Sequence, residues 1–205
     1  MRANILRYKH NQMDDLERQL QKIPKEAPKL IATDGVFSTF GTIAELKKLT
    51  KLAKKYNAQV AVDDAHGFGV IGPNGKGTAH HFGVEMDVDL ILCTFSKTLA
   101  SIGGFVVGND RAINYLKHKS PALIFSASPT PASVASAMAA LEVLIDQPHL
   151  VTRVQENAEY VRKGLQSVGF DVPDGETAIV PVFIGDDEKT FLFWRKLYDL
   201  GVFVN

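Results

Sequence analysis

Two hydrophobic patterns alternate along the first part of the chain. Over 43–56, in "IAELKKLTKLAKKY", apolar residues recur every three or four positions, which predicts an amphipathic helix. The same spacing predicts a shorter helix over 11–22. The runs "KLIATD", "AQVAVDDA", "VDLILCTFS" and "GGFVVG" are short and almost wholly apolar, as strands buried on both faces are. Helices that alternate with such strands predict an α/β fold with a mainly parallel sheet and helices over both faces.

The pattern changes after position 130. "ASVASAMAALEVLI" predicts an alanine-rich helix, and 149–168 predicts a second helix that ends before Gly169. "AIVPVFI", "EKTFLFWRKLYDLG" and "VFVN" then predict a strand, a helix and a strand. We therefore predict that residues 1–150 belong to a large sheet domain and that residues 151–205 begin a smaller α+β domain.

Composition excludes several classes of protein. The 205 residues include 23 Lys and Arg and 23 Asp and Glu, so no basic surface for nucleic acid is expected. The single cysteine, Cys93, excludes a disulfide framework and favours a reducing cytoplasm. No apolar run approaches the roughly 20 residues of a membrane helix. His80 and His81 lack a third ligand at suitable spacing, so no metal site is expected. The sequence predicts a soluble, cytoplasmic protein without a transmembrane segment.

The stretch "AVDDAHGFGVIGPNGKG", residues 61–77, has two features of a nucleotide site: an acidic strand end and a glycine-rich run. A phosphate loop requires Gly, four residues, and then Gly-Lys followed by Ser or Thr. The only Gly-Lys pair is Gly75-Lys76, Gly77 follows it, and Val70 stands where the first glycine belongs. The ATPase interpretation therefore fails, and the glycine-rich run needs another explanation.

Polar side chains follow three of the predicted strands. In an open parallel sheet, the ligand crevice lies outside the carboxyl ends of the strands. Carboxylate, imidazole, amine and hydroxyl groups are therefore expected to face one crevice. These groups belong to Ser38 after the first strand, Asp63, Asp64 and His66 after the second, and Thr94, Ser96 and Lys97 after the third.

A carboxylate and a lysine at neighbouring strand ends suit pyridoxal phosphate. The lysine forms a Schiff base with the aldehyde, and the carboxylate keeps the pyridine nitrogen protonated so that the ring accepts electrons. Each residue also has a plainer interpretation. Lys97 could be a solvated charge, Asp63 a turn or helix cap, and His66 a capping or partly buried histidine. Their joint placement at strand ends favours a catalytic site over these plainer interpretations.

Four motifs carry a resemblance to a known family. "VDDAHGFGVIGPNGKG" followed by "CTFSKTLASIGGFVVG" closely resembles the α-oxoamine synthases, pyridoxal-phosphate enzymes of fold type I. "DGVFSTFG" resembles the family's Glu-Gly-Val-Phe-Ser-Met-Asp-Gly stretch, and "FSASPTPASVAS" resembles its cross-subunit loop. These enzymes condense an amino acid with an acyl-CoA and release carbon dioxide. The resemblance runs through essentially all 205 residues, which look like the central half of a family member.

The resemblance implies catalytic roles for three residues. Lys97 matches the lysine that forms the Schiff base, Asp63 the partner of the pyridine nitrogen, and His66 the partner of the ring hydroxyl. The implied reaction is a Claisen condensation, in which the amino acid displaces Lys97 and its carbanion attacks the acyl-CoA. Once displaced, Lys97 is expected to carry the proton.

The resemblance also implies contacts made by hydroxyl groups. Ser38, Thr94 and Ser96 would contact the cofactor within the same subunit. Ser128, in "FSAS", would reach the phosphate of the cofactor in a neighbouring subunit. A cross-subunit contact of this kind implies a homodimer.

Within the family, the sequence most resembles the members that condense L-serine with palmitoyl-CoA to 3-ketodihydrosphingosine, the first step of sphingolipid synthesis. Thr39-Phe40-Gly41 replaces the usual Met-Asp-Gly, and a hydrophobic residue at that Asp resembles bacterial enzymes of this branch. Thr42 also departs from the family pattern, while Trp194 and the terminal "GVFVN" favour the same branch. The alternatives are an 8-amino-7-oxononanoate synthase, a 2-amino-3-ketobutyrate CoA ligase, or a truncated chain without catalytic function.

The resemblance further predicts that these 205 residues alone are not a working enzyme. In the family, a loop that caps the phosphate and an aromatic ring that stacks on the cofactor precede the matched region. An arginine for the substrate carboxylate follows it. Contacts of this kind are each worth about 1–3 kcal/mol, so losing several would lower cofactor affinity by several orders of magnitude. Exposed apolar edges would also favour association.

Overall fold

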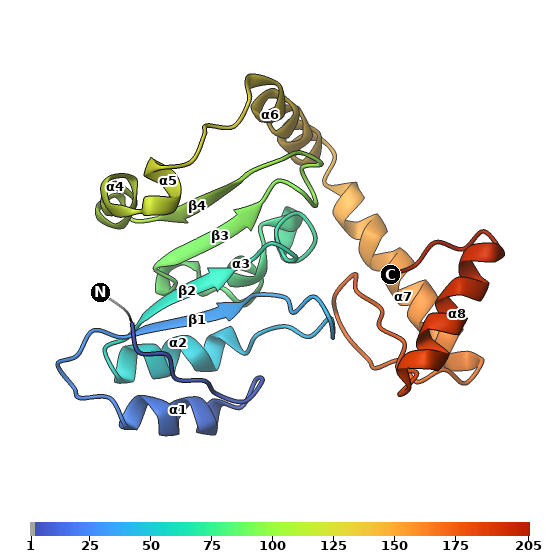
Figure 1. The fold of residues 1–205 in the computed structure, drawn as a ribbon, viewed down its shortest axis with the longest axis horizontal. Helices are drawn as coiled ribbons and strands as arrows, with labels where there is room; N and C mark the ends of the chain where they lie inside the picture. The colour runs from blue at the N-terminus through green and yellow to red at the C-terminus, as the bar shows by residue number, and fades with distance from the viewer. Residues whose placement is uncertain (1–2) are drawn as a thin grey trace.

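The computed structural model describes residues 3–205, which build helices around a four-stranded sheet (Figure 1). The strands are β1 (Leu30–Asp34), β2 (Gln59–Asp63), β3 (Leu90–Thr94) and β4 (Gly104–Gly108). Two short 3-10 helices, η1 (Pro73–Gly75) and η2 (Glu85–Asp87), flank α3 in the chain. The α-helices are α1 (Met13–Gln21), α2 (Leu46–Lys55), α3 (Thr78–Phe82), α4 (Asp110–Lys119), α5 (Pro121–Ile124), α6 (Pro131–Asp146), α7 (His149–Ser167) and α8 (Asp187–Asp199).

The sheet has the order β1-β2-β3-β4. β1, β2 and β3 are parallel, whereas β4 is antiparallel to β3. Helix α2 connects β1 to β2, and α3 lies in the connection from β2 to β3. Parallel neighbours need crossover connections of this kind, whereas the loop 95–103 is short enough to reverse the chain into β4. The predicted α/β fold with a mainly parallel sheet is confirmed.

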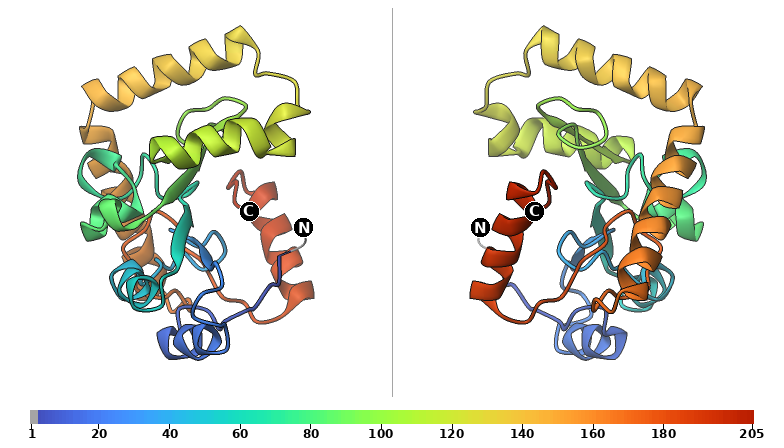
Figure 2. Two further views of the ribbon diagram at one scale, coloured as in Figure 1. Left: turned by 90° about the vertical axis from the view of Figure 1, so that its left-hand side faces the viewer. Right: turned by 90° about the vertical axis from the view of Figure 1, so that its right-hand side faces the viewer.

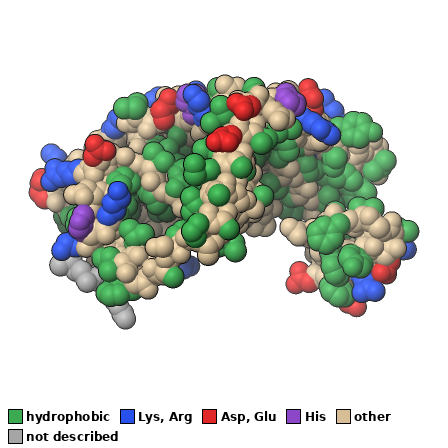
Figure 3. Space-filling model, turned by 90° about the horizontal axis from the view of Figure 1, so that it is seen from above, with side chains coloured by type: hydrophobic (Ala, Val, Ile, Leu, Met, Phe, Trp, Pro, Cys, Tyr) green, Lys and Arg blue, Asp and Glu red, His purple; other side chains and the backbone are tan. Residues whose placement is uncertain are grey.

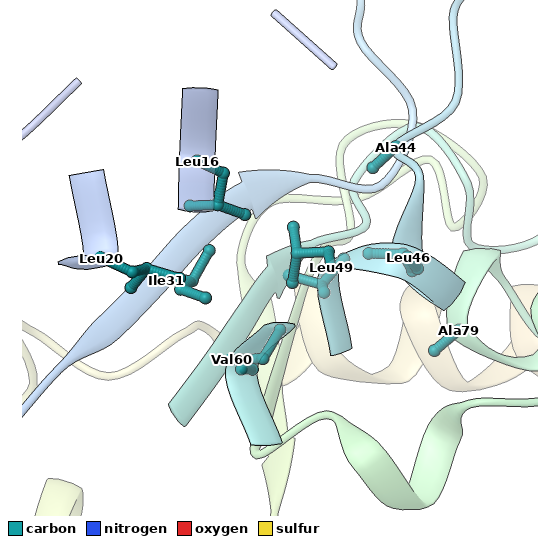
Figure 4. Packing of buried hydrophobic residues seen from close by; sticks show 10 residues of the cluster. Leu16, Leu20, Ile31, Ala44, Leu46, Leu49, Val60 and Ala79 are labelled. Atoms are coloured by element: carbon teal, nitrogen blue, oxygen red, sulfur yellow. The ribbon is translucent and has the colours of Figure 1, made fainter. Parts of the chain in front are cut away.

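The main core lies between the sheet and the helices α1 and α2. Leu46, Leu49 and Ala53 recur every three or four positions along α2, so they share one face of the helix. This face packs on β1 and β2 and therefore fixes the two strands whose carboxyl ends carry candidate site residues. The buried cluster consists of Leu16, Leu20, Ile31, Ala44, Leu46, Leu49, Ala53, Val60, Val62 and Ala79 (Figure 4).

The opposite face of the sheet is partly open. Asp34, Asp63, Leu92 and Val106 are neighbours in register across the four strands, so their side chains point to the same face. Leu92 and Val106 on this face are 37% and 40% exposed, and Leu30 is 59% exposed. Within residues 3–205, the prediction of helices over both faces therefore holds fully only for the face that packs on α1 and α2.

The C-terminal part contains the predicted helix, α8, which stands apart from the sheet (Figure 2). The two strands predicted around it, over 178–184 and 202–205, are wrong: neither segment is a strand. A strand requires a hydrogen-bonded neighbour, and no strand within residues 3–205 pairs with either segment. Isolated bonds hold them instead, such as the one from Trp194 Nε1 to the carbonyl of Val204 (2.9 Å).

Helix α6 carries an exposed hydrophobic stripe. Val134, Met138, Leu141 and Ile145 are exposed and are spaced so that they share one side of the helix. Seen from the side of α6, the surface shows many hydrophobic side chains (Figure 3). A contiguous stripe of this kind is typical of a protein interface. Among the helices of residues 3–205, none is long and apolar enough to cross a membrane.

Candidate active site

Two carboxylates lie side by side at the carboxyl ends of β1 and β2. Asp34 and Asp63 are the last residues of their strands and pair in register, so both side chains lie on the open face of the sheet. Asp63 is exposed, and its Oδ1 accepts a hydrogen bond from the backbone N–H of Ala65 (3.1 Å). Within residues 3–205, no donor reaches Oδ2 of Asp63. Asp63 can therefore offer one oxygen to a ligand.

Lys97 lies on the loop between β3 and β4. The backbone N–H of Phe95 donates to the carbonyl of Gly103 (2.9 Å), which closes the loop at its base. The hydroxyl oxygens of Thr94 and Ser96 are 2.8 Å apart, and the Lys97 side chain is exposed. The loop thus presents an amine and two hydroxyl groups at the carboxyl end of β3, beside the end of β2.

The charges of four residues act on one another at this edge of the sheet. Burial lowers the pKa of His66, the Lys97 ammonium lowers it further, and Asp34 and Asp63 raise it. Burial also raises the pKa of Asp34, with a further rise from Asp63, while His66 and Lys97 act in the opposite direction. The carboxyl ends of β1, β2 and β3 are neighbours in the sheet, so Asp34, Asp63, His66 and Lys97, which end or follow these strands, form one cluster. The structure thus brings together the three residues that the sequence assigned to catalysis.

Asp34 is the member of this cluster that the sequence interpretation missed. It ends the strand "KLIATD" as Asp63 ends the next strand, so its position at a strand end could have identified it from the sequence. Its relevance depends on the register of β1 against β2, which places the two carboxylates directly beside each other. No local pattern in the sequence specifies that register.

Asp64 has an environment unlike that of Asp63. It is 2% exposed, its Oδ2 accepts from the backbone N–H of Thr78 (2.7 Å), and its Oδ1 accepts from the Thr78 hydroxyl. Added Cβ atoms on Gly67 and Gly77 would each lie 2.1 Å from a carboxylate oxygen of Asp64. The carboxylate is therefore bonded and enclosed, which favours Asp63 over Asp64 as the partner of a ligand.

In the glycine-rich segment, residues 67–77, this buried carboxylate leaves no space for a side chain at Gly67 or Gly77. The segment leads the chain from β2 to α3 along a tight path, with backbone hydrogen bonds from Gly69 to Gly75 (2.7 Å) and from Gly77 to Ile71 (2.9 Å). Gly77 has a φ of 93°, which side chains rarely adopt, and Asp64 leaves no space for one. The failed phosphate-loop motif thus has a structural explanation.

The burial of Asp64 predicts a pH effect on stability. Burial raises the pKa of the Asp64 carboxyl against the lowering effect of its bonds from Thr78. The folded protein therefore binds this proton more tightly than the unfolded chain does. The contribution to stability is full below the ordinary pKa of aspartate and is lost as the pH rises through the raised value. The asparagine of Asp64→Asn cannot ionise. The free energy of unfolding of this variant, relative to that of wild type, should therefore increase as the pH rises from about 4 toward 7.

Urea unfolding of the complete gene product at several pH values measures this difference. Asp146→Asn, at the exposed end of α6, is the matched control and should show no comparable gain. A difference between Asp64→Asn and wild type that stays constant or shrinks with rising pH would contradict the prediction.

Ser38 lies on the exposed turn that follows β1. Backbone hydrogen bonds join Phe37 to Thr42 (2.9 Å) and Gly41 to Phe37 (2.9 Å), so the turn has a defined shape. A far part of the chain supports it, because the hydroxyl of Thr177 donates to the carbonyl of Gly41 (2.7 Å).

Phe40, which stands where the family pattern has Asp, lies on the same turn. Its ring centroid is 5.9 Å from that of His10 and 6.3 Å from that of Phe183. Phe40 itself is 47% exposed, so the rings of Phe40, His10 and Phe183 form an aromatic surface beside Ser38 rather than a buried core. An aspartate at this position would put a charge into that surface.

Ser128 lies elsewhere, in the exposed segment between α5 and α6. Among residues 3–205, no hydrogen bond joins it to the strand-end cluster. The structure therefore does not place Ser128 with Asp63, His66 and Lys97 in one chain. Its predicted contact with a neighbouring subunit stays a prediction.

The available groups fit pyridoxal phosphate. The open oxygen of Asp63 suits a protonated pyridine nitrogen, the imidazole of His66 suits a ring hydroxyl, and the exposed amine of Lys97 suits an aldehyde. Within residues 3–205, no group of three or more His, Cys, Asp or Glu could hold a metal ion.

Comparisons with known proteins agree with these motifs. The chain is 49% identical to a serine palmitoyltransferase of Sphingobacterium spiritivorum over 203 residues, which are 99% of this chain and 51% of the relative. It is 42% identical to an 8-amino-7-oxononanoate synthase of Thermoanaerobacter pseudethanolicus, over 98% of this chain and 51% of the relative. The chain thus spans about half the length of the curated relatives it matches.

A solved serine palmitoyltransferase from S. paucimobilis, with a bound PLP–myriocin aldimine, superposes with a TM-score of 0.95 at 37% identity. The match covers 99% of this chain and 53% of that one, and it confirms the predicted fold type I. These relatives also confirm the resemblance to the α-oxoamine synthases. The family model "Aminotransferase class I and II" matches residues 1–205, so the chain belongs to the class I and II aminotransferase family.

Proposed function

We propose that the protein is a pyridoxal-phosphate-dependent acyltransferase of sphingolipid synthesis. It condenses L-serine with palmitoyl-CoA, with loss of carbon dioxide and CoA, to form 3-ketodihydrosphingosine. The observation that carries this proposal is the cluster of Asp63, His66 and Lys97 in a chain 49% identical to a serine palmitoyltransferase. When bound, the cofactor supplies an electron sink for the carbanion of the amino acid.

Each residue of the cluster has a role in this proposal. Lys97 holds the cofactor covalently and, after the amino acid displaces it, carries the α-proton on its amine. Asp63 offers its open carboxylate oxygen to the pyridine N–H, and a fixed negative charge there stabilises the proton on that nitrogen. His66 orients the ring through its hydroxyl. The lowered pKa of His66 supports a neutral imidazole in that role near neutral pH.

The hydroxyl groups complete the proposed site. Thr94 and Ser96, 2.8 Å apart, contact the cofactor from the Lys97 loop, and Ser38 contacts it from the turn after β1. Ser128 reaches the cofactor phosphate of a second subunit in a homodimer. The exposed hydrophobic stripe on α6, which follows Ser128 in the chain, supports an interface between subunits.

We also propose that the protein acts in the cytoplasm and that residues 151–205 begin a smaller domain after the sheet domain of residues 1–150. The single buried cysteine supports a reducing compartment. The separate position of α8 supports the domain division.

An 8-amino-7-oxononanoate synthase is the second candidate, because such an enzyme shares 42% identity with the chain. Measuring CoA release by the complete gene product with serine, glycine and alanine decides between these reactions. Serine should be the preferred amino acid with palmitoyl-CoA, and a preference for glycine or alanine would reject the serine branch. Reading the DNA on both sides of the reading frame establishes what the complete gene product is and whether the catalytic proposal applies to a longer protein.

A further inference from the structure

Thr98, the residue after Lys97, is attached to the glycine-rich segment at two points. Its hydroxyl donates a hydrogen bond to the backbone carbonyl of Phe68 (2.8 Å). Its methyl group lies against Gly69, where an added Cβ atom would be 2.1 Å from Thr98 Cγ2. Gly69 also has a φ of 76°, a backbone conformation that favours glycine. The Lys97 loop therefore approaches the segment closely only because Gly69 has no side chain.

The glycine-rich segment is in turn fixed to the end of β2. The backbone N–H groups of Gly67 and Phe68 donate to the carbonyl of Asp64, at 3.1 and 2.9 Å. The N–H of Asp64 donates to the carbonyl of Leu92 on β3 (2.8 Å), and the Asp64 carboxylate is buried and bonded. Phe68 therefore has a fixed position relative to Asp63, the residue before Asp64.

We propose that Thr98 is a positioning residue, which fixes Lys97 relative to Asp63 and His66 by tying its loop to the glycine-rich segment. The inference rests on the proposed function of Lys97. The Asp63 carboxylate follows β2, whereas the Lys97 amine follows β3. The hydrogen bonds from Phe68 to Asp64 and from Thr98 to Phe68 join these two strand ends. A side chain whose backbone is already fixed loses less freedom when it engages a ligand.

The hydrogen bonds closest to Lys97 run within its own loop: the N–H of Ala100 donates to the carbonyl of Lys97 (3.1 Å), and the N–H of Ser96 donates to the hydroxyl of Thr94 (3.2 Å). Ser96 and Lys97 are exposed, and Ala100 has a φ of 46°. Beyond Lys97, Leu99 is buried and the hydroxyl of Ser101 donates to the carbonyl of Ser133 on α6 (2.7 Å). Loss of the Thr98 hydroxyl should therefore loosen Lys97 without unfolding the loop.

The first test uses the complete gene product without cofactor. Burial lowers the pKa of His66, the Lys97 ammonium lowers it further, and Asp34 and Asp63 raise it, so a displacement of Lys97 with the burial of His66 unchanged should shift the titration of His66. An NMR titration of the His66 ring, assigned with His66→Gln, should move to higher pH in Thr98→Val. Thr98→Ser keeps the donor and should titrate as wild type does. The control is Thr190→Val, which removes a hydroxyl bonded to a backbone carbonyl (2.7 Å) on the distant helix α8.

The second test adds pyridoxal phosphate and measures its dissociation constant by visible absorbance, with borohydride trapping at Lys97. A hydrogen bond is worth enough to change affinity about 2- to 10-fold, so Thr98→Val should bind that much more weakly. Thr98→Ser and Thr190→Val should stay near wild type. If Thr98→Val does not fold, Thr98→Ala takes its place.

The outcomes separate the two proposals. A His66 shift in Thr98→Val, together with no trapped cofactor at Lys97 in the wild-type protein, would reject the proposed function and keep the positioning role. An unchanged His66 titration in Thr98→Val, or an equal change in Thr98→Ser, would overturn the positioning role.

Discussion

Replacing Lys97 with alanine is expected to abolish the covalent attachment of pyridoxal phosphate. Borohydride traps an aldehyde as a stable adduct only through the Schiff base of an amine, and Lys97 is the lysine of the strand-end cluster. Asp63 and the hydroxyls of Thr94 and Ser96 remain in the variant, so weak reversible binding should persist while the covalent adduct is lost. Borohydride reduction of the complete gene product, followed by peptide mapping with mass spectrometry, measures the adduct directly.

Lys76→Ala is the matched control for this experiment. Lys76 is an exposed lysine of the glycine-rich segment, and its loss should leave the adduct at Lys97 intact. An adduct that persists in Lys97→Ala, or one that maps to another lysine in wild type, would remove Lys97 from its proposed role. Loss of binding in both variants would show instead that the lysines act only through surface charge.

The elements that the sequence predicted well are those whose pattern arises from local burial. Helix α2 is an example, because Leu46, Leu49 and Ala53 must share one face wherever the helix packs. Strand β2 is another, since a short run of buried residues between turns has few alternatives. Asp63 and Lys97 could be placed for the same reason, because strand ends follow directly from strand positions.

The features that the sequence did not specify depend on partners far away in the chain. Residues 178–184 are apolar enough for a strand, yet no strand within residues 3–205 lies beside them. Asp34 joins the cluster through the register of β1 against β2, which no single segment encodes. The hydrogen bond from Thr98 to Phe68 likewise joins residues thirty positions apart. The sequence indicates it only through the glycine at position 69, whose reason becomes visible in the structure.

Asp63→Asn is expected to keep the cofactor bound but to reduce turnover greatly. Asparagine has nearly the same shape, so contacts from Lys97 and the hydroxyl groups survive. The lost contact is a hydrogen bond between charged groups, worth about 1.5–3 kcal/mol, and without it the pyridine nitrogen loses its proton. Since each 1.36 kcal/mol is tenfold in rate and the electron sink itself is weakened, turnover should fall about 100-fold or more.

The competing assignment is Asp64, the neighbouring carboxylate. Its two oxygens are bonded to Thr78 and it is 2% exposed, whereas Asp63 is exposed with one oxygen open. Steady-state turnover of Asp63→Asn and Asp64→Asn, each at saturating cofactor, therefore separates the two carboxylates, with Asp146→Asn as the surface control. The loss should be much greater in Asp63→Asn, while absorbance titration shows that the cofactor still binds, about 10- to 100-fold more weakly than in wild type. Near-normal turnover in Asp63→Asn together with a large loss in Asp64→Asn would transfer the role to the buried carboxylate. A failure of Asp63→Asn to bind cofactor would mean that the Asp63 charge is needed to bind the pyridine ring and not only to keep its nitrogen protonated.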